Sequence, residues 1–149
     1  MKSILIIEDD SFKADSLSHY FERQGQNYNI SLVGSLSEAT EIVNEREFDL
    51  ILVDMAIPSH PSVAGGGSPT SLLTGGIDVL LELNYLNRSD PCVVVTQYPD
   101  IKIADIYYNL QEAPNVLKSE LGCEVIACIE YKEENNNWES ILSEIIKKI

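Results

Sequence analysis

The sequence predicts an α/β fold, in which helices cover both faces of a doubly wound, five-stranded parallel sheet. Short apolar runs of strand length alternate along the chain with segments of helical periodicity, a pattern typical of such sheets. Several runs are apolar at every position, as expected for strands that are buried on both faces. Function is then expected at the carboxyl ends of the strands.

The first strand is predicted at Ser3–Ile7, where four aliphatic residues follow one another directly. A helix is expected at Ser11–Arg23, because its apolar residues recur at helical spacing. The side chains of this helix that can form a stripe facing the sheet are Phe12, Leu17, Tyr20 and Phe21.

The second strand is predicted at Tyr28–Val33, whose weaker, alternating hydrophobicity indicates a position nearer the edge of the sheet. The stretch "SLSE" at Ser35–Glu38 matches a capping box, which begins a helix. The run "DLILVD" at Asp49–Asp54 predicts a third, fully buried strand that ends in a carboxylate.

The second half of the chain continues the alternation. A helix is predicted at Ile77–Leu86, and strands at Cys92–Thr96 and Glu124–Tyr131. A last helix carries apolar residues at helical spacing, namely Trp138, Ile141, Leu142, Ile145 and Ile146.

Two connections are longer than is usual in this fold class. A Gly-, Ser- and Pro-rich loop is predicted at 55–75, where loops of about 2–6 residues are the norm. A lengthened connection at 97–123 has room for a helix near Ile101–Leu110 and for a second short one.

Length and composition predict one domain over residues 1–149, with no membrane span and no signal peptide, and therefore a cytoplasmic protein. The 24 acidic and 10 basic residues give a net charge of −14, which opposes binding to nucleic acid or to an anionic membrane. Cys92, Cys123 and Cys128 lack metal-binding spacing and are expected to be buried, reduced thiols.

Carboxylates cluster where two predicted strands end. Glu8 and Asp9 follow the first strand and Asp54 ends the third, so a hard cation such as Mg²⁺ could hold them together. The alternative is that acids at a wet strand end are simply solvated. Asp10 either caps the following helix or adds a ligand, and capping is the preferred interpretation.

Three further positions are consistent with phosphoryl chemistry. Asp54 is placed as a nucleophile, because carboxylates do form aspartyl-phosphates. Thr96 ends another apolar strand and could donate a hydrogen bond to a phosphoryl oxygen. Lys132 follows the last strand and could neutralise phosphoryl charge.

The segments "ILIIEDD", "DLILVDMAIP", "VVVT" and "EYK" occur in that order, and the chain thereby resembles the receiver domains of two-component response regulators. The resemblance implies a flavodoxin-like strand order 2-1-3-4-5. It also implies that Glu8, Asp9 and Asp54 hold Mg²⁺ together with the carbonyl oxygen of Ala56. The family's glycine after the acceptor loop corresponds to Gly76.

The resemblance further implies that Asp54 is the phosphoacceptor, with Thr96 and Lys132 assisting the transfer. The expected donor is a histidine kinase or a phosphotransfer protein. Three positions depart from the family pattern. Ile129 stands where an aromatic switch residue is usual, and Glu133 stands where a proline usually follows the lysine. Gln97 stands where a small residue usually follows the hydroxyl residue, and could restrict access or position water.

The leading hypothesis is a stand-alone receiver that signals through an unidentified downstream protein and turns over no separate substrate. The last helix is expected to leave no room for an output domain, and a homodimer is a further option. The alternative is a pseudo-receiver, an interaction module that does not switch by phosphorylation. A Mg²⁺-dependent phosphohydrolase ranks third, because Ala56 replaces the second aspartate that such phosphatases carry.

Overall fold

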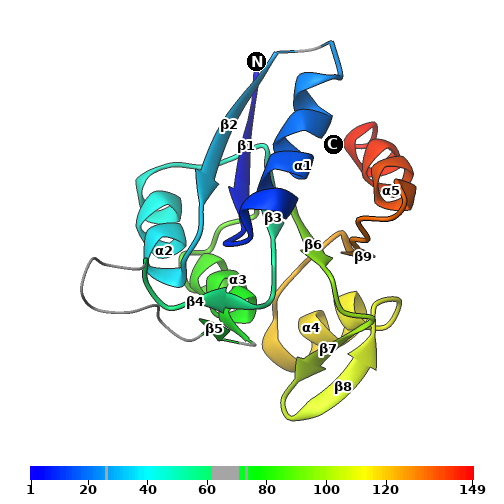
Figure 1. Ribbon diagram of the computed structural model, residues 1–149. Coiled ribbons are helices and arrows are strands. Elements are labelled where there is room, and N and C mark those ends of the chain that lie inside the picture. Colours follow the sequence, from blue (N-terminus) through cyan, green and yellow to red (C-terminus); the bar gives the residue numbers. More distant parts are fainter. Residues whose placement is uncertain (26, 62–70, 73) are drawn as a thin grey trace, which may run out of the picture.

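The computed structural model describes residues 1–25, 27–61, 71–72 and 74–149. Its main sheet is parallel and has five strands in the order β2-β1-β3-β6-β9 (Figure 1). Counting these five strands alone, the order is 2-1-3-4-5, which confirms the predicted fold class. The strands are β1 (Lys2–Ile7), β2 (Tyr28–Val33), β3 (Leu50–Val53), β6 (Cys92–Thr96) and β9 (Ala127–Glu130).

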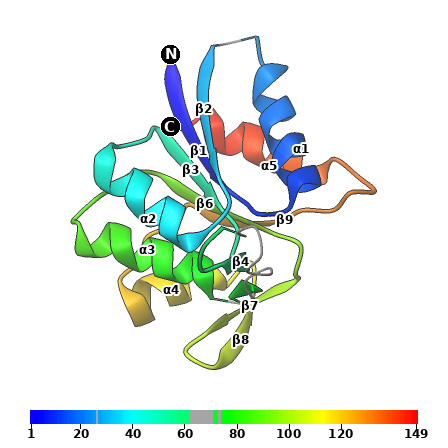
Figure 2. The same cartoon turned by 60° about the vertical axis from the view of Figure 1, so that its left-hand side comes forward.

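Helices cover both faces of this sheet (Figure 2). The first and last helices, α1 (Ser11–Glu22) and α5 (Asn137–Ile146), lie on one face. The other face carries α2 (Leu36–Glu45), α3 (Gly75–Tyr85) and α4 (Ala113–Leu121). The chain therefore has two apolar layers, one on each side of the sheet, and alternate strand residues face opposite layers.

Helix α1 begins where its cap requires. The Asp10 carboxylate accepts a hydrogen bond from the Phe12 backbone N–H at 3.0 Å, which confirms the predicted capping role. The buried face then contains Lys13, Leu17 and Phe21, at i, i+4 and i+8. Phe12 lies one position outside this stripe and is 57% exposed, so its predicted inward position was wrong.

The predicted start of α2 is confirmed, with Ser35 as its N-cap. Ser35 Oγ accepts a hydrogen bond from the Glu38 N–H at 3.2 Å and donates one to the Glu38 carboxylate at 2.9 Å. Ala39 and Val43 lie on the buried face of this helix.

The connection 97–123 differs from its prediction. The segment near Ile101–Leu110 is no helix but an antiparallel hairpin of β7 (Asp100–Ile103) and β8 (Ile106–Asn109). Its turn residues, Ala104 and Asp105, both have positive φ angles, of 50° and 69°. Two such residues in succession fit a tight hairpin turn and stop a helix from continuing. The second, short helix of the prediction is present as α4.

The loop 55–75 contains a small antiparallel pair, β4 (Ile57–Pro58) with β5 (Ser71–Leu72). Residues 62–70 and 73 of this predicted loop lie outside the described residues.

The last helix and the thiols mostly follow their predictions. In α5, Trp138, Leu142 and Ile145 are buried, whereas Ile141 is 47% exposed and does not face the core as predicted. All three cysteines are free; two are buried, and Cys128 is half-buried. Burial raises the pKa of Cys92 to about 12. In the part of the chain that the structure describes, no helix is both long and apolar enough to cross a membrane.

Near the amino end of β6, an arginine joins two connections to the end of α2. The Arg88 guanidinium donates to both Asp90 carboxylate oxygens, from Nε at 2.8 Å and from Nη2 at 2.9 Å. It also donates to the carbonyl oxygens of Val43 and, at 2.7 Å, of Arg46. Asp90 accepts a further hydrogen bond from the Phe48 N–H at 2.7 Å. The network links the end of α2 to the segments that lead into β3 and β6.

Replacing Arg88 by Met is expected to lower the free energy of unfolding by roughly 3 kcal/mol, because it leaves a buried carboxylate without its charged partner. Urea denaturation measures the change. Lys118→Met is the matched control, since Lys118 pairs with Glu124 on the exposed surface and should cost less than about 1 kcal/mol. Equal losses in the two variants would show that the Arg88 network is not structural.

Candidate functional site

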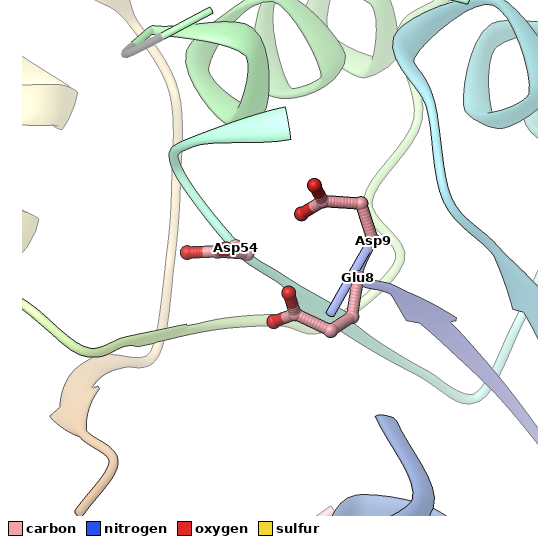
Figure 3. A group of neighbouring side chains, drawn as sticks. All are labelled: Glu8, Asp9 and Asp54. Atoms are coloured by element: carbon pink, nitrogen blue, oxygen red, sulfur yellow. The ribbon is translucent and has the colours of Figure 1, made fainter. Parts of the chain in front are cut away.

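The acidic site forms where β1 and β3 end side by side. Their register pairs Ile7 with Val53, so the next residues, Glu8 and Asp54, leave the sheet at the same edge. The Asp54 backbone N–H still donates to the Ile7 carbonyl oxygen at 3.1 Å, which fixes the position of the acid. Figure 3 shows the side chains of Glu8, Asp9 and Asp54 gathered there, with one carboxylate oxygen of each within 4.8 Å of the others.

Two of these acids are buried. Glu8 and Asp54 are each 3% exposed, whereas Asp9 is exposed. Desolvation raises the pKa of Glu8 to about 8, against the opposing effect of the neighbouring Lys13 charge. Burial likewise raises the pKa of Asp54, again opposed by Lys13. Two buried carboxylates, Glu8 and Asp54, therefore share the positive charge of one lysine, Lys13.

The donor set fits a hard divalent cation. Glu8 Oε1 and Asp54 Oδ1 are buried oxygens, and within the described residues both face the same ammonium group, that of Lys13, at 2.6 Å and 3.5 Å. Together with the exposed Asp9, they offer the carboxylate oxygens that Mg²⁺ prefers, on a side that water can reach. Ala56 is half-buried, and its backbone N–H donates to the Asp54 carboxylate. The role of its carbonyl oxygen as a ligand stays a prediction.

A lysine that the sequence analysis did not select lies at the centre of the site. Lys13 Nζ is 2.6 Å from Glu8 Oε1 and 3.5 Å from Asp54 Oδ1. It also donates to the Val95 carbonyl oxygen at 2.7 Å and to Gln97 Oε1 at 3.0 Å. Its place on the buried stripe of α1, four residues before Leu17, is the signal that could have identified it.

Thr96 lies where it was predicted, at the carboxyl end of β6, and is fully buried. Its Oγ1 accepts a hydrogen bond from the Tyr98 N–H at 3.2 Å. The neighbouring strand β9 continues its pairing past its last residue, since the Tyr131 N–H donates to the Thr96 carbonyl oxygen at 2.8 Å.

Lys132 does not join the acidic group in this structure. Tyr131 is buried and its hydroxyl donates to Ser16 Oγ on α1 at 2.9 Å. Lys132, the next residue, is exposed. Among the ion pairs of the described residues, none includes Lys132. Its role in phosphoryl transfer stays a prediction.

Helix α3 begins directly against the backbone of the acidic site. The Gly76 N–H donates to the Met55 carbonyl oxygen at 2.9 Å. A Cβ atom at Gly76 would lie 2.3 Å from the Asp54 carbonyl oxygen, and one at Gly75 would lie 2.6 Å from Ile57 Cγ1. Both positions therefore require glycine for this close approach.

Comparison with known proteins assigns the chain to a family. A family model of the response regulator receiver domain matches residues 4–120. The Detocs response regulatory protein DtcB of Vibrio alginolyticus is 32% identical over 147 residues, which are 97% of this chain and 99% of that protein. The transcriptional regulatory protein ZraR of Escherichia coli K12 is 29% identical over 101 residues, which are 68% of this chain but only 19% of ZraR.

Solved structures agree on the fold. A CheY-like receiver domain protein from Methanospirillum hungatei JF-1 superimposes with a TM-score of 0.64 at 21% identity, over 99% of this chain and 93% of that one. The Mn(2+)-bound form of response regulator Rcp1 gives a TM-score of 0.62 at 18% identity, over 97% and 91% of the two chains. Identities this low support the fold alone. With the family match over residues 4–120, however, the assignment is clear: the chain belongs to the response regulator receiver domains of two-component signalling.

Proposed function

We propose that this receiver accepts a phosphoryl group on Asp54 from a histidine kinase or a phosphotransfer protein, and signals by protein contacts from the cytoplasm. The observation that carries the proposal is the Asp54 carboxylate itself. It is buried at a strand end beside two other acids, and its Oδ1 accepts no close hydrogen bond from the described residues, since Lys13 Nζ lies 3.5 Å away. A carboxylate buried for structural reasons alone would be expected to have a closely bonded partner on each oxygen.

In the proposed step, a carboxylate oxygen of Asp54 attacks the phosphorus of the donor. A new O–P bond forms as the bond from phosphorus to the donor imidazole nitrogen breaks, and that nitrogen keeps the electron pair. Positioning and charge neutralisation are the main contributions of a protein to this reaction. The Ala56 N–H, which donates to the Asp54 carboxylate, holds the nucleophile in place. No separate substrate is turned over.

Glu8, Asp9 and Asp54 would hold Mg²⁺, with the carbonyl oxygen of Ala56 as a further ligand. When bound, the ion would withdraw negative charge from the acids and from the incoming phosphoryl oxygens. Lys132 is the family's candidate for neutralising the rest of that charge. Its side chain, exposed in this structure, would have to turn inward to do so.

Thr96 is proposed to change its hydrogen bonding when Asp54 is phosphorylated. Its hydroxyl oxygen now accepts a hydrogen bond from the Tyr98 N–H. Donation of its proton to a phosphoryl oxygen would draw the side chain toward Asp54 and disturb the start of the segment that leads to the β7–β8 hairpin. That hairpin exposes Ile106 and Tyr107, and Tyr98 beside it is also exposed, so a partner could read the change there.

The pseudo-receiver remains the second candidate, because of Ile129. This residue stands in the aromatic switch position, is only 2% exposed, and packs in the apolar layer under α1 and α5. An aliphatic side chain fixed in that layer offers no aromatic ring to move between surface and interior. A receiver could then keep its phosphoacceptor chemistry and lack the family's usual switch.

The test is phosphoryl uptake from acetyl phosphate, followed by intact-mass spectrometry after an acid quench. The wild-type protein is expected to gain the mass of one phosphoryl group in Mg²⁺ and none in a chelator. Circular dichroism in both buffers shows that the protein is folded. No uptake by folded protein in Mg²⁺ would overturn the proposal and favour the pseudo-receiver.

The metal assignment predicts a contrast between two neighbouring acids. Asp9→Asn is expected to weaken Mg²⁺ binding by about tenfold or more, because it removes a charged oxygen ligand. Asp10→Asn removes the same charge one residue further on, yet asparagine can still cap α1. It should change the affinity by less than about twofold at physiological ionic strength. Isothermal titration calorimetry measures both, and equal effects would show that charge alone, rather than ligation by Asp9, sets the affinity.

A further inference from the structure

The ammonium group of Lys13 occupies the space between the two buried acids. Four oxygen atoms surround Nζ: Glu8 Oε1 at 2.6 Å, the Val95 carbonyl at 2.7 Å, Gln97 Oε1 at 3.0 Å and Asp54 Oδ1 at 3.5 Å. Two of these acceptors come from the acidic site and two from the end of β6 and the residue after it. The group therefore bridges the strand ends on which the proposed chemistry depends.

Complete burial makes this placement informative. Lys13 is 0% exposed, and lysine is almost never fully buried unless it is paired. Its Nζ lies 5.9 Å from the centre of the Tyr131 ring, which covers it from the β9 side. With Tyr131 tied to Ser16 on α1, the lysine is held in a closed setting and is not a mobile surface charge.

Lys132, which stands at the position of the family's lysine, is exposed, whereas Lys13 is buried. The residue before Lys132, Tyr131, takes the inward position next to α1. The chain therefore carries a lysine at the site, but supplies it from α1 instead of from the end of β9.

We propose that Lys13 is a second charge-neutralising lysine of this receiver, in addition to Lys132, and that its ammonium group competes with Mg²⁺ for the oxygens of Glu8 and Asp54. The inference rests on the proposed function, because it assigns Lys13 to the phosphoryl charge that forms on Asp54. In the unmodified protein Lys13 offsets part of the acidic charge. After phosphoryl transfer it lies within reach of the new oxygens on Asp54.

The experiment compares two lysine-to-methionine variants, which remove the same charge at different places. Lys13→Met is expected to bind Mg²⁺ at least tenfold more tightly by isothermal titration calorimetry, because the competing cation is gone. It is also expected to take up phosphoryl from acetyl phosphate at least tenfold more slowly at saturating Mg²⁺. Lys118→Met, which removes an exposed lysine of α4 that pairs with Glu124, should stay within twofold of the wild type in both measurements. A lysine that serves only to hold the fold would not change affinity and rate in opposite directions.

The outcomes separate the inference from the proposed function. A Lys13→Met protein that takes up phosphoryl at the wild-type rate would overturn the inference, as would one whose Mg²⁺ affinity is unchanged or lower. If the wild type takes up no phosphoryl group, the proposed function fails, and the calorimetric comparison alone decides whether Lys13 competes for the acids. If Lys13→Met does not fold, Lys13→Gln takes its place in both measurements, with the same expected results. Glutamine keeps an N–H donor and loses only the charge.

Discussion

Asp54→Asn protein is expected to take up no phosphoryl group from acetyl phosphate in Mg²⁺, whereas the wild type takes up one. The amide oxygen carries no negative charge and cannot act as the nucleophile of the proposed step. In a chelator, the same variant should be more stable than the wild type by about 1–2 kcal/mol. Burial raises the pKa of Asp54, so its charged form is unfavourable there, and the substitution leaves Glu8 and Lys13 as a balanced pair.

Intact-mass spectrometry and thermal unfolding measure the two effects in the same samples. Asp15→Asn is the matched control, because Asp15 is exposed on α1 and its substitution should leave uptake intact and stability within about 0.5 kcal/mol. A phosphoryl group on Asp54→Asn would place the acceptor at another residue. A less stable variant in chelator would mean that the attraction between Asp54 and Lys13 exceeds the penalty of burying the acid.

The sheet and the acidic group could be predicted because both depend on local pattern. Runs of consecutive apolar residues mark β1, β3 and β6, and the ends of the adjacent strands β1 and β3 bring Glu8 and Asp54 together. The capping residues Asp10 and Ser35 fixed where helices begin. No knowledge of distant contacts was needed for these features.

Lys13 could not be predicted from residue type alone. An amphipathic reading of α1 places charged residues on the outer face and so favours Phe12 for the core. In the structure α1 instead buries residues 13, 17 and 21 on the face that packs against the sheet. Burial of the lysine is then compensated by Glu8 and by oxygens at the end of β6, more than 80 residues later in the chain.

The β7–β8 hairpin was missed for a related reason. Its residues include isoleucines and tyrosines that suit either a short helix or a strand, and the turn has no glycine to mark it. The positive φ angles of Ala104 and Asp105 are unusual for residues with side chains, so sequence propensity gives little sign of the turn. Burial of Ile101 and Ile103 against the rest of the protein selects the strand.

Gly76→Ala is expected to lower the free energy of unfolding by about 3 kcal/mol or more. The new Cβ would lie 2.3 Å from the Asp54 carbonyl oxygen and 2.9 Å from Met55 Cα, so backbone, and not a flexible side-chain end, would have to move. The hydrogen bond from the Gly76 N–H to the Met55 carbonyl oxygen holds the two segments together and limits that movement. Urea denaturation measures the loss.

Gly34→Ala is the matched control for this clash. A Cβ atom there would meet Glu8 O at 3.5 Å, which is ordinary contact, so the loss should stay below about 1 kcal/mol. Because the displaced backbone belongs to Asp54 itself, Gly76→Ala should also slow phosphoryl uptake under conditions where the variant is still folded. A variant that is destabilised but takes up phosphoryl at the wild-type rate would show that α3 supports the fold without positioning the acceptor. Slow uptake by folded protein would instead show that the glycine lets α3 hold Asp54 in its reactive position.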